Sequence, residues 1–339
     1  MTKPVTLSVL DIVPLRSGYT AGQAFAETLA LAQYVESLGY YRYWFAEHHG
    51  MGGVASTSPA LLAGQVAAVT KKIRVGSGGV MLPNHAPLVI AEQFGTLEAL
   101  FPGRIDLGIG RAPGADRLTT AVLRRASTGA EDDFPEQLQE LFHFFRGTFP
   151  ADHPYSRVQS VPALGNEPPV WLLGSSGYSA QLAARLGLPF SFAHHFSQAN
   201  TLPALALYRG SFRPSPALAA PKVMLGVIAI IAETDQEARR LALPTALSFL
   251  RLQRNQTGPY PTVEQAEAHP WSFAEKAFVQ EWMASNIIGS PVFARRQLNN
   301  LIDDTNADEL IVLCTAPNLD SRKKSYAMLR ELIPVAPQQ

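Results

Sequence analysis

Residues 41–50 read YRYWFAEHHG, an apolar run that ends abruptly in Glu47, His48 and His49. A strand of a parallel sheet is buried on both faces, so only the loop after its C-terminal end can present polar groups to a ligand. The stretch therefore predicts a strand of an α/β enzyme and a functional role for these three side chains. For any one of them, a structural histidine or a simple ion pair stays open. A metal site is disfavoured, because adjacent strand residues point to opposite faces and metal-ligand pairs are usually spaced about two to four residues apart.

Strands and helices alternate on both sides of this stretch. Periodicity and Gly or Pro breakers predict strands at residues 5–10, 41–45, 73–81, 105–109, 170–173, 190–193, 223–231 and 309–314. Helices are predicted at residues 20–37, 58–70, 87–100, 178–186, 197–212, 235–255 and 320–332, with another beginning at residue 290. Eight strands that each lead to a helix, with no internal linker, predict one (β/α)8 TIM barrel over residues 1–339. A doubly wound sheet is the alternative, but it needs a topological reversal that the sequence does not mark.

Two connections are longer than an ordinary crossover, and we interpret them as insertions in the active-site loops. The first covers about residues 112–169 and contains helices predicted at 115–125 and 134–146. The second covers about residues 256–288, with a proline-containing loop at 256–271 and a short helix at 273–285. Residues 112–132 and 256–271 would form the substrate pocket, where the few charges include Arg117, Arg124 and Arg125.

The composition sets limits on the class of protein. Lys plus Arg and Asp plus Glu number 28 each, so no dominant field predicts nucleic acid or an acidic partner. Hydrophobic residues make up 47%, yet no apolar run approaches the ~18 residues of a membrane span, and the N-terminus does not read as a signal peptide. Cys314 is the only cysteine and lies in an apolar strand, which predicts an inert buried thiol. We expect a cytoplasmic protein.

Residues 169–180, PVWLLGSSGYSA, lead from a buried strand through a turn of small residues into a helix. Gly174, Ser175 and Ser176 would let backbone N–H groups converge on an oxygen, and the helix N-terminus adds a partial positive charge. An ordinary helix cap explains the serines equally well. Neither G-x-G-x-x-G nor a Walker lysine pattern is present, so a single phosphate is a better hypothesis than a pyrophosphate.

Glycines and an arginine mark the ends of two further strands. Residues 76–79 read GSGG inside a predicted strand, where glycine weakens a sheet unless another backbone or a flat ligand must come close. Arg111 follows the strand at 105–109, where a guanidinium could bind phosphate or a carboxylate, although a plain surface arginine is the alternative. Asn84 and His85 are predicted on the same rim, where the sequence gives weaker support for a functional role.

Taken in order, these pieces resemble the flavin-dependent luciferase-like monooxygenases, the family of the bacterial luciferase subunits. The resemblance covers nearly the whole chain. The motifs that carry it are WFAEHH at 44–49, IRVGSGGVMLP at 73–83, GRIDLGIGR at 103–111 and VWLLGSSGYS at 170–179.

The resemblance implies a barrel that binds FMN or reduced FMN noncovalently at the C-terminal ends of its strands. The phosphate site would use the backbone at Ser175 and Ser176 within the turn that begins at Gly174. The Ser179 hydroxyl and the Arg111 side chain would complete it. A cis peptide would join Gly78 and Gly79 beneath the flavin ring.

His48 is implied as the histidine that assists the oxygen chemistry, with Glu47 as its catalytic neighbour. The protonation state of a histidine is adjustable near pH 7, as proton transfer requires.

The leading functional hypothesis is an FMNH2-dependent monooxygenase that activates O2 and oxygenates a small organic substrate, with FMNH2 supplied by a separate flavin reductase. The alternatives are an F420-dependent oxidoreductase on the same barrel and a non-catalytic flavin-binding protein. Ser175 and Gly110 stand where luciferase has an acidic residue and a cysteine. The chain is therefore more similar to the family's single-component oxidoreductases than to light-emitting members. The resemblance also implies a homodimer.

Overall fold

The computed structural model describes residues 3–112, 114–123 and 133–334. Nine strands form one sheet in the order β6-β5-β4-β3-β2-β1-β9-β7-β8, and an additional pairing of β6 with β7 closes it. The strands are β1 Thr6–Asp11, β2 Arg42–Phe45, β3 Arg74–Met81, β4 Ile105–Gly110, β5 Val170–Gly174, β6 Phe190–Phe192, β7 Val223–Ile231, β8 Ile287–Gly289 and β9 Glu309–Leu313. Every pairing between these strands is parallel.

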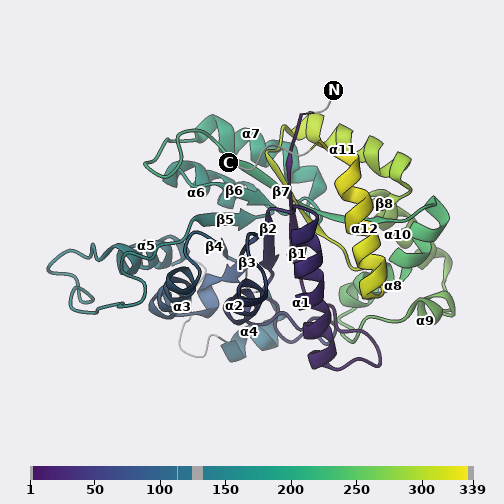
Figure 1. Cartoon of the computed structure of the whole chain (residues 1–339), viewed down its shortest axis with the longest axis horizontal. Helices are drawn as coiled ribbons and strands as arrows, with labels where there is room; N and C mark the ends of the chain where they lie inside the picture. Colours follow the sequence, from purple (N-terminus) through teal and green to yellow (C-terminus); the bar gives the residue numbers. More distant parts are fainter. Residues whose placement is uncertain (1–2, 113, 124–132, 335–339) are drawn as a thin grey trace.

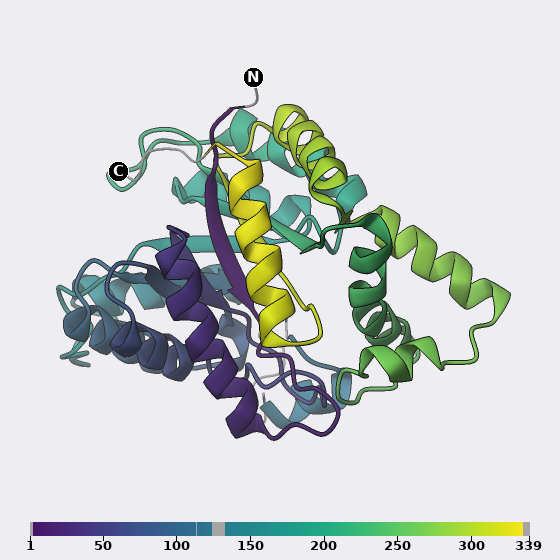
Figure 2. The same ribbon diagram turned by 45° about the vertical axis from the view of Figure 1, so that its right-hand side comes forward.

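Eight of the strands make the closed barrel, and β8 pairs only with the C-terminal end of β7. Helices surround the strands, with α12 beside α1 on the outside of β1 (Figures 1 and 2). The α-helices are α1 Ala21–Ser37, α2 Pro59–Val69, α3 Pro87–Leu100, α4 Arg117–Leu123, α5 Phe134–Arg146, α6 Gly177–Leu186, α7 Thr201–Ser211, α8 Asp235–Gln253, α9 Val263–Glu267, α10 Phe273–Ala284, α11 Pro291–Thr305 and α12 Leu319–Leu332. Two 3-10 helices are η1 Leu82–Asn84 and η2 Gln198–Asn200. The predicted (β/α)8 TIM barrel is confirmed.

Local sequence explains where the helices begin. Thr20 accepts a hydrogen bond from the backbone N–H of Gln23, whose side chain accepts one from the N–H of Thr20, so the two residues form a capping box before α1. Thr262 and Gln265 form the same box before α9. The prediction of a loop across residues 256–271 is therefore wrong at α9, because capping overrides the proline-rich composition.

Two further differences concern short elements. β8 was not predicted, because a three-residue strand is too short to show a period. The helix predicted at 115–125 is α4, Arg117–Leu123, and the predicted residues Arg124 and Arg125 lie outside the described residues.

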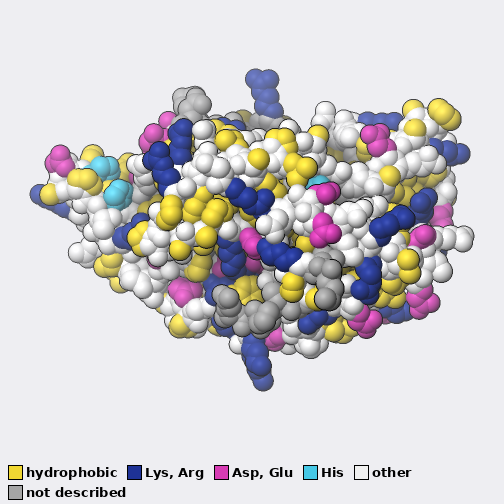
Figure 3. Space-filling model, turned by 90° about the horizontal axis from the view of Figure 1, so that it is seen from above, with side chains coloured by type: hydrophobic (Ala, Val, Ile, Leu, Met, Phe, Trp, Pro, Cys, Tyr) yellow, Lys and Arg dark blue, Asp and Glu magenta, His cyan; other side chains and the backbone are white. Residues whose placement is uncertain are grey.

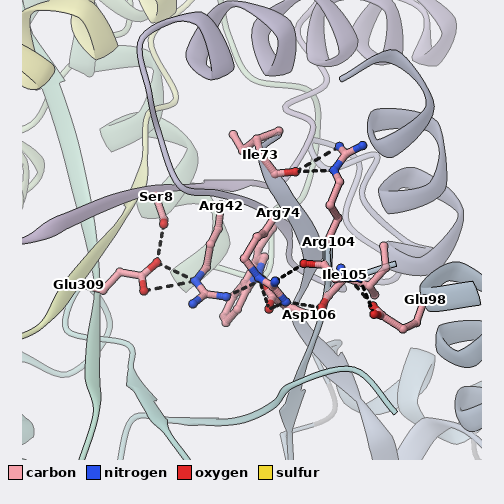
Figure 4. A network of polar contacts seen from close by, with 11 residues as sticks. Ser8, Arg42, Ile73, Arg74, Glu98, Arg104, Ile105, Asp106 and Glu309 are labelled. Atoms are coloured by element: carbon pink, nitrogen blue, oxygen red, sulfur yellow. Dashed lines mark hydrogen bonds and ion pairs between the residues drawn. The ribbon is translucent and has the colours of Figure 1, made fainter. Parts of the chain in front are cut away.

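The interior of the barrel is layered. At the N-terminal ends of the strands, Arg42, Arg74, Asp106 and Glu309 form a cluster of ion pairs (Figure 4). In the next layer Trp44 from β2 and Trp171 from β5 meet edge to face, with ring centroids 5.6 Å apart. The barrel is thus filled up to the level of the tryptophans and open above them.

The surface carries charges of both signs between apolar groups (Figure 3). None of the described helices is long and apolar enough to cross a membrane. Cys314, directly after β9, is buried as predicted, and burial raises the pKa of its thiol.

Candidate functional site

A cavity of about 360 Å³ opens at the C-terminal ends of the barrel strands. It brings together seven of the nine predicted site residues: His48, Gly78, Arg111, Gly174, Ser175, Ser176 and Ser179. Trp44 and Leu10 also line it, below the predicted residues. Glu47 and Gly79 do not line this cavity. The site residues therefore converge from β2, β3, β4 and β5, as expected for parallel strands that end on one rim.

Glycines keep the cavity open. A Cβ atom on Gly78 would lie 2.8 Å from Leu10 Cδ1 and 3.1 Å from Trp44 Cβ, and one on Gly226 would lie 2.9 Å from the ring of His195. The peptide bond between Gly78 and Gly79 is cis, as the resemblance predicts. A Cβ on Gly79 would come within 2.7 Å of Gly108 O, so this glycine serves the contact between β3 and β4.

The N-terminus of α6 forms one end of the cavity. Ser176 is its N-cap, yet the Ser176 side chain makes no capping hydrogen bond, so the first amides of the helix remain available. Ser179 is only 7% exposed, and its hydroxyl has no hydrogen-bond partner among the described residues. Gly174 lets this turn close, because a Cβ there would lie 2.4 Å from Ser179 Cβ. These unpaired donors fit an anion of phosphate size.

Arg111 lies at the same end, just after β4. Its guanidinium stacks over the Tyr178 ring at 4.2 Å and is half-buried. Within the described part of the chain its side chain has no acidic partner and no hydrogen bond. A planar cation that is positioned but not neutralised is suited to bind phosphate.

His48 stands on the wall of the cavity. Its Nδ1 lies 3.2 Å from the backbone oxygen of Gly114, and because a carbonyl only accepts, Nδ1 carries the proton. Burial lowers the pKa of His48, against the opposite effects of Gly114 and Glu47. The ring is therefore neutral at pH 7, and its Nε2 is free to accept a proton.

Glu47 points away from the cavity into a cluster of its own. Its carboxylate is hydrogen-bonded to His49 Nε2 at 2.9 Å and to His85 Nε2 at 2.8 Å, and it accepts from the N–H of Met81 at 3.0 Å. Burial favours a higher pKa for Glu47, but the bonds from His85, Met81 and His49 outweigh it and lower the pKa. These contacts tie the end of β2 to the end of β3. The catalytic role predicted for Glu47 stays a prediction, and its contacts are those of a positioning residue.

His195 lines the cavity and was not predicted. Its Nδ1 donates to Gly226 O at 2.8 Å, and burial lowers its pKa to about 4. His194 and His195 follow β6 closely, much as His48 and His49 follow β2, so the same pattern of a histidine pair after a strand could have revealed it. The cavity thus presents two neutral histidines, each with its proton fixed on Nδ1.

The chain matches known proteins over most of its length. A family model described as luciferase-like monooxygenase matches residues 6–304. A luciferase-like monooxygenase of Escherichia coli strain K12 is 46% identical, over 91% of each chain. An N-acetyl-S-alkylcysteine monooxygenase of Bacillus subtilis is 33% identical, over 97% of this chain and 98% of the relative.

Solved structures also resemble this chain in fold. The structure of apo-MsnO8 superposes with a TM-score of 0.88 at 36% identity, covering 98% of this chain and all of that one. Two distant structures share the fold alone. One is the oxygenating constituent of 3,6-diketocamphane monooxygenase from Pseudomonas putida with FMN, at a TM-score of 0.71 and 19% identity over 98% of each chain. The other is an F420-dependent secondary alcohol dehydrogenase, at 0.68 and 14% over 98% of this chain and 99% of that one.

Proposed function

The chain belongs to the luciferase-like monooxygenase family, and from that premise we propose that it is an FMN-dependent monooxygenase that oxygenates a small organic substrate with O2. The observation that carries this proposal is the single cavity in which an anion-binding end, a glycine wall and a neutral histidine face one another. A separate reductase would supply reduced FMN, since this chain has no dinucleotide-binding fingerprint.

The residues present fit FMN. The amides after Ser175 and Ser176, the unpartnered Ser179 hydroxyl and the unneutralised Arg111 would hold its phosphate. Gly78 leaves room for a flat ring above Trp44. When bound, reduced FMN supplies the electrons that activate O2. Apolar walls such as Leu10 exclude water from the reacting groups.

His48 would hold or transfer a proton at Nε2, because Nδ1 is occupied by Gly114 O. Glu47 would fix the loop that carries His48, and its hydrogen bonds with His85 and with the N–H of Met81 support this role. Gly79 would act on the cofactor indirectly, through the packing of β3 on β4.

The test is the variant His48→Ala. We expect unchanged FMN affinity and a loss of substrate-dependent oxygenation of about 10²–10⁴-fold, the usual contribution of a positioned acid or base. The matched control is His143→Ala, which removes a histidine of α5 that lies outside both the cavity and the hydrogen-bonded cluster around Glu47. Substrate-dependent consumption of reduced flavin in a coupled reductase assay reports the rate. Unchanged turnover in His48→Ala would remove His48 from the mechanism.

F420 is the second candidate cofactor, because the fold is shared with an F420-dependent dehydrogenase. Equilibrium titration with FMN and with F420 distinguishes them, and tighter binding of F420 would reverse the assignment. A flavin-binding protein without turnover would show O2 consumption by its reduced-flavin complex at the rate of free flavin in stopped-flow mixing. The two neutral histidines argue against that third possibility, since storage needs only the phosphate site.

We also propose a cytoplasmic homodimer. Early barrel helices leave large apolar side chains at the surface, with Leu61 of α2 73% exposed and Leu100 of α3 65% exposed. Light scattering at micromolar concentration should give the mass of a dimer, and a monomer would remove this part of the proposal.

A further inference from the structure

A second cavity of about 230 Å³ adjoins the first and shares His48, Phe196 and Leu313 with it. It lies between the loop after β2 and the C-terminal turn of α8. Its walls are mainly apolar and include Met51, Val54, Phe249 and Leu252. A compound in this cavity would therefore reach the histidine on the wall of the first one.

Close backbone contacts build the walls. Leu15 donates its N–H to Gly53 O at 2.9 Å and accepts at its own oxygen from the N–H of Tyr260 at 2.8 Å. A Cβ on Gly53 would lie 2.7 Å from Gly258 O and 3.2 Å from the Tyr260 ring. The two loops are thus held together on the end of β1, and the cavity is part of the folded barrel.

One cation lines this cavity without compensation. Ser248, Arg251 and Leu252 have the i, i+3, i+4 spacing that places them on one face of α8, and all three line the cavity. The Arg251 side chain has no ion pair or hydrogen bond with any described residue, and the lining contains no Asp or Glu. Arg254 of the following turn differs, because it donates to Glu275 at 2.7 Å.

A second polar group lacks a partner. Tyr260 is 9% exposed and lines the same cavity, and its hydroxyl makes no hydrogen bond with the described residues. A hydroxyl and a cation that line an apolar cavity without a protein partner are open to a ligand that can bind both. A carboxylate satisfies both, since it accepts two bonds from a guanidinium and a further one from a hydroxyl.

We propose that the second cavity is the substrate site and that the substrate is an organic carboxylate with an apolar body. The carboxylate binds Arg251, with Tyr260 as a further donor, and the apolar body extends past Val54 and Phe249 towards His48. Naming this compound the substrate rests on the proposed monooxygenase function, whereas the carboxylate site itself does not.

The experiment is calorimetric titration of the purified protein, without flavin, with straight-chain carboxylates from hexanoate to dodecanoate and with the matching alcohols. We expect at least one carboxylate to bind ten-fold or more tightly than its alcohol. Arg251→Gln should abolish that preference, Arg251→Lys should retain part of it, and Tyr260→Phe should weaken carboxylate binding several-fold. Arg239→Gln is the matched control, because Arg239 is an exposed arginine of the same helix that does not line the cavity.

Three results overturn the inference: no carboxylate binds, carboxylate and alcohol bind equally, or Arg251→Gln binds carboxylate as wild type does. In the last case, Arg251 would only stabilise the C-terminal end of α8 through the helix dipole, and a lowered melting temperature would be its single effect. FMN titration of the same preparations separates the two proposals. FMN binding without carboxylate preference overturns this inference alone, and carboxylate preference without binding of FMN or F420 overturns the proposed function alone.

Discussion

The two ends of the barrel use the same strands for opposite purposes. β2 begins with Arg42 and leads to His48, and β4 carries Asp106 near its start and leads to Arg111. At the N-terminal end the charges satisfy one another, and at the C-terminal end the Arg111 guanidinium and the Ser179 hydroxyl have no partner among the described residues. A charge that the protein neutralises internally stabilises the fold, whereas one that it positions and leaves free indicates a ligand.

The N-terminal cluster is saturated. Asp106 accepts from Arg42 Nη1 at 2.6 Å and from Arg74 Nη2 at 2.7 Å (Figure 4). It also accepts from Trp44 Nε1 at 3.1 Å. Glu309 accepts from Arg42 Nε at 2.9 Å. Burial favours a higher pKa for Asp106, but the two arginines outweigh it and lower the pKa. Asp106 therefore keeps its charge, and protein groups take up its hydrogen-bonding capacity.

The largest effect is expected from Asp106→Asn. The change removes the charge that compensates Arg42 and Arg74 in the barrel interior, and breaking a buried pair on one side costs about 3–5 kcal/mol. Urea unfolding followed by circular dichroism measures the loss. FMN affinity of the folded fraction should change little, because the variant lies below the tryptophan layer. The control is Asp303→Asn on the exposed side of α11, which should change stability by less than about 0.5 kcal/mol.

A different outcome would contradict the assignment of the N-terminal cluster to stability and of the C-terminal end to ligand binding. If Asp106→Asn were as stable as wild type but bound FMN poorly, the N-terminal cluster would belong to the ligand site. Trp44 is the route by which that could occur, since its indole both donates to Asp106 and lines the cavity.

The two ends also differ in how far the sequence predicts them. The rim was predictable because its residues lie in the C-terminal parts of strands or in the turns and helix starts that follow them, so that local position in the chain is enough to place them. The ion cluster at the N-terminal end was not predictable. Arg42 lies inside an apolar run, and its partners come from β4 and β9, far along the chain. Closure of the barrel brings Arg42 and its partners together, and no local sequence pattern indicates that contact.

Two of the predicted site residues, Glu47 and Gly79, do not line the cavity, and their functional roles stay predictions. Side chains alternate along extended backbone, so the carboxylate of Glu47 faces away from the side of the chain on which His48 lies. His195 was missed although the strand at 190–193 was predicted, because no acidic residue accompanies His194 and His195 as Glu47 accompanies His48 and His49. The barrel itself was predicted because it rests on eight strand–helix units, so a wrong assignment in one unit does not change the fold class.

An intermediate effect is expected from Arg111→Gln, which tests whether the free cation of the rim is reserved for a phosphate. Removal of one charge-assisted contact should weaken FMN binding by about 2 kcal/mol, roughly 30-fold, and leave riboflavin binding unchanged because riboflavin has no phosphate. Fluorescence titration with both flavins gives the two dissociation constants.

Arg117→Gln is the control for Arg111→Gln, because Arg117 is an exposed arginine of α4 that does not line the cavity. Equal weakening of FMN and riboflavin in Arg111→Gln would show that Arg111 supports the ring or the fold, and the rim would then resemble the saturated end of the barrel.

The smallest effect is a loss of folding stability at low pH, and we expect it to arise from the C-terminal end of the barrel. The pKa of His195 is lowered to about 4 by burial, and an unfolded histidine titrates near 6.5, so between these values the unfolded chain binds a proton that the folded chain does not. The free energy of unfolding therefore falls as the pH drops through this window. His195 contributes about 1 kcal/mol to this fall, because solvent in the cavity screens part of the effect of its burial. Asp106 has a lowered pKa and keeps its charge throughout the window, so the N-terminal cluster does not contribute to the fall. Urea unfolding of wild type and His195→Gln at pH 7 and pH 5 measures the difference. The stability of wild type relative to the variant should decline on acidification, and a constant difference would mean that His195 is already solvated and titrates normally.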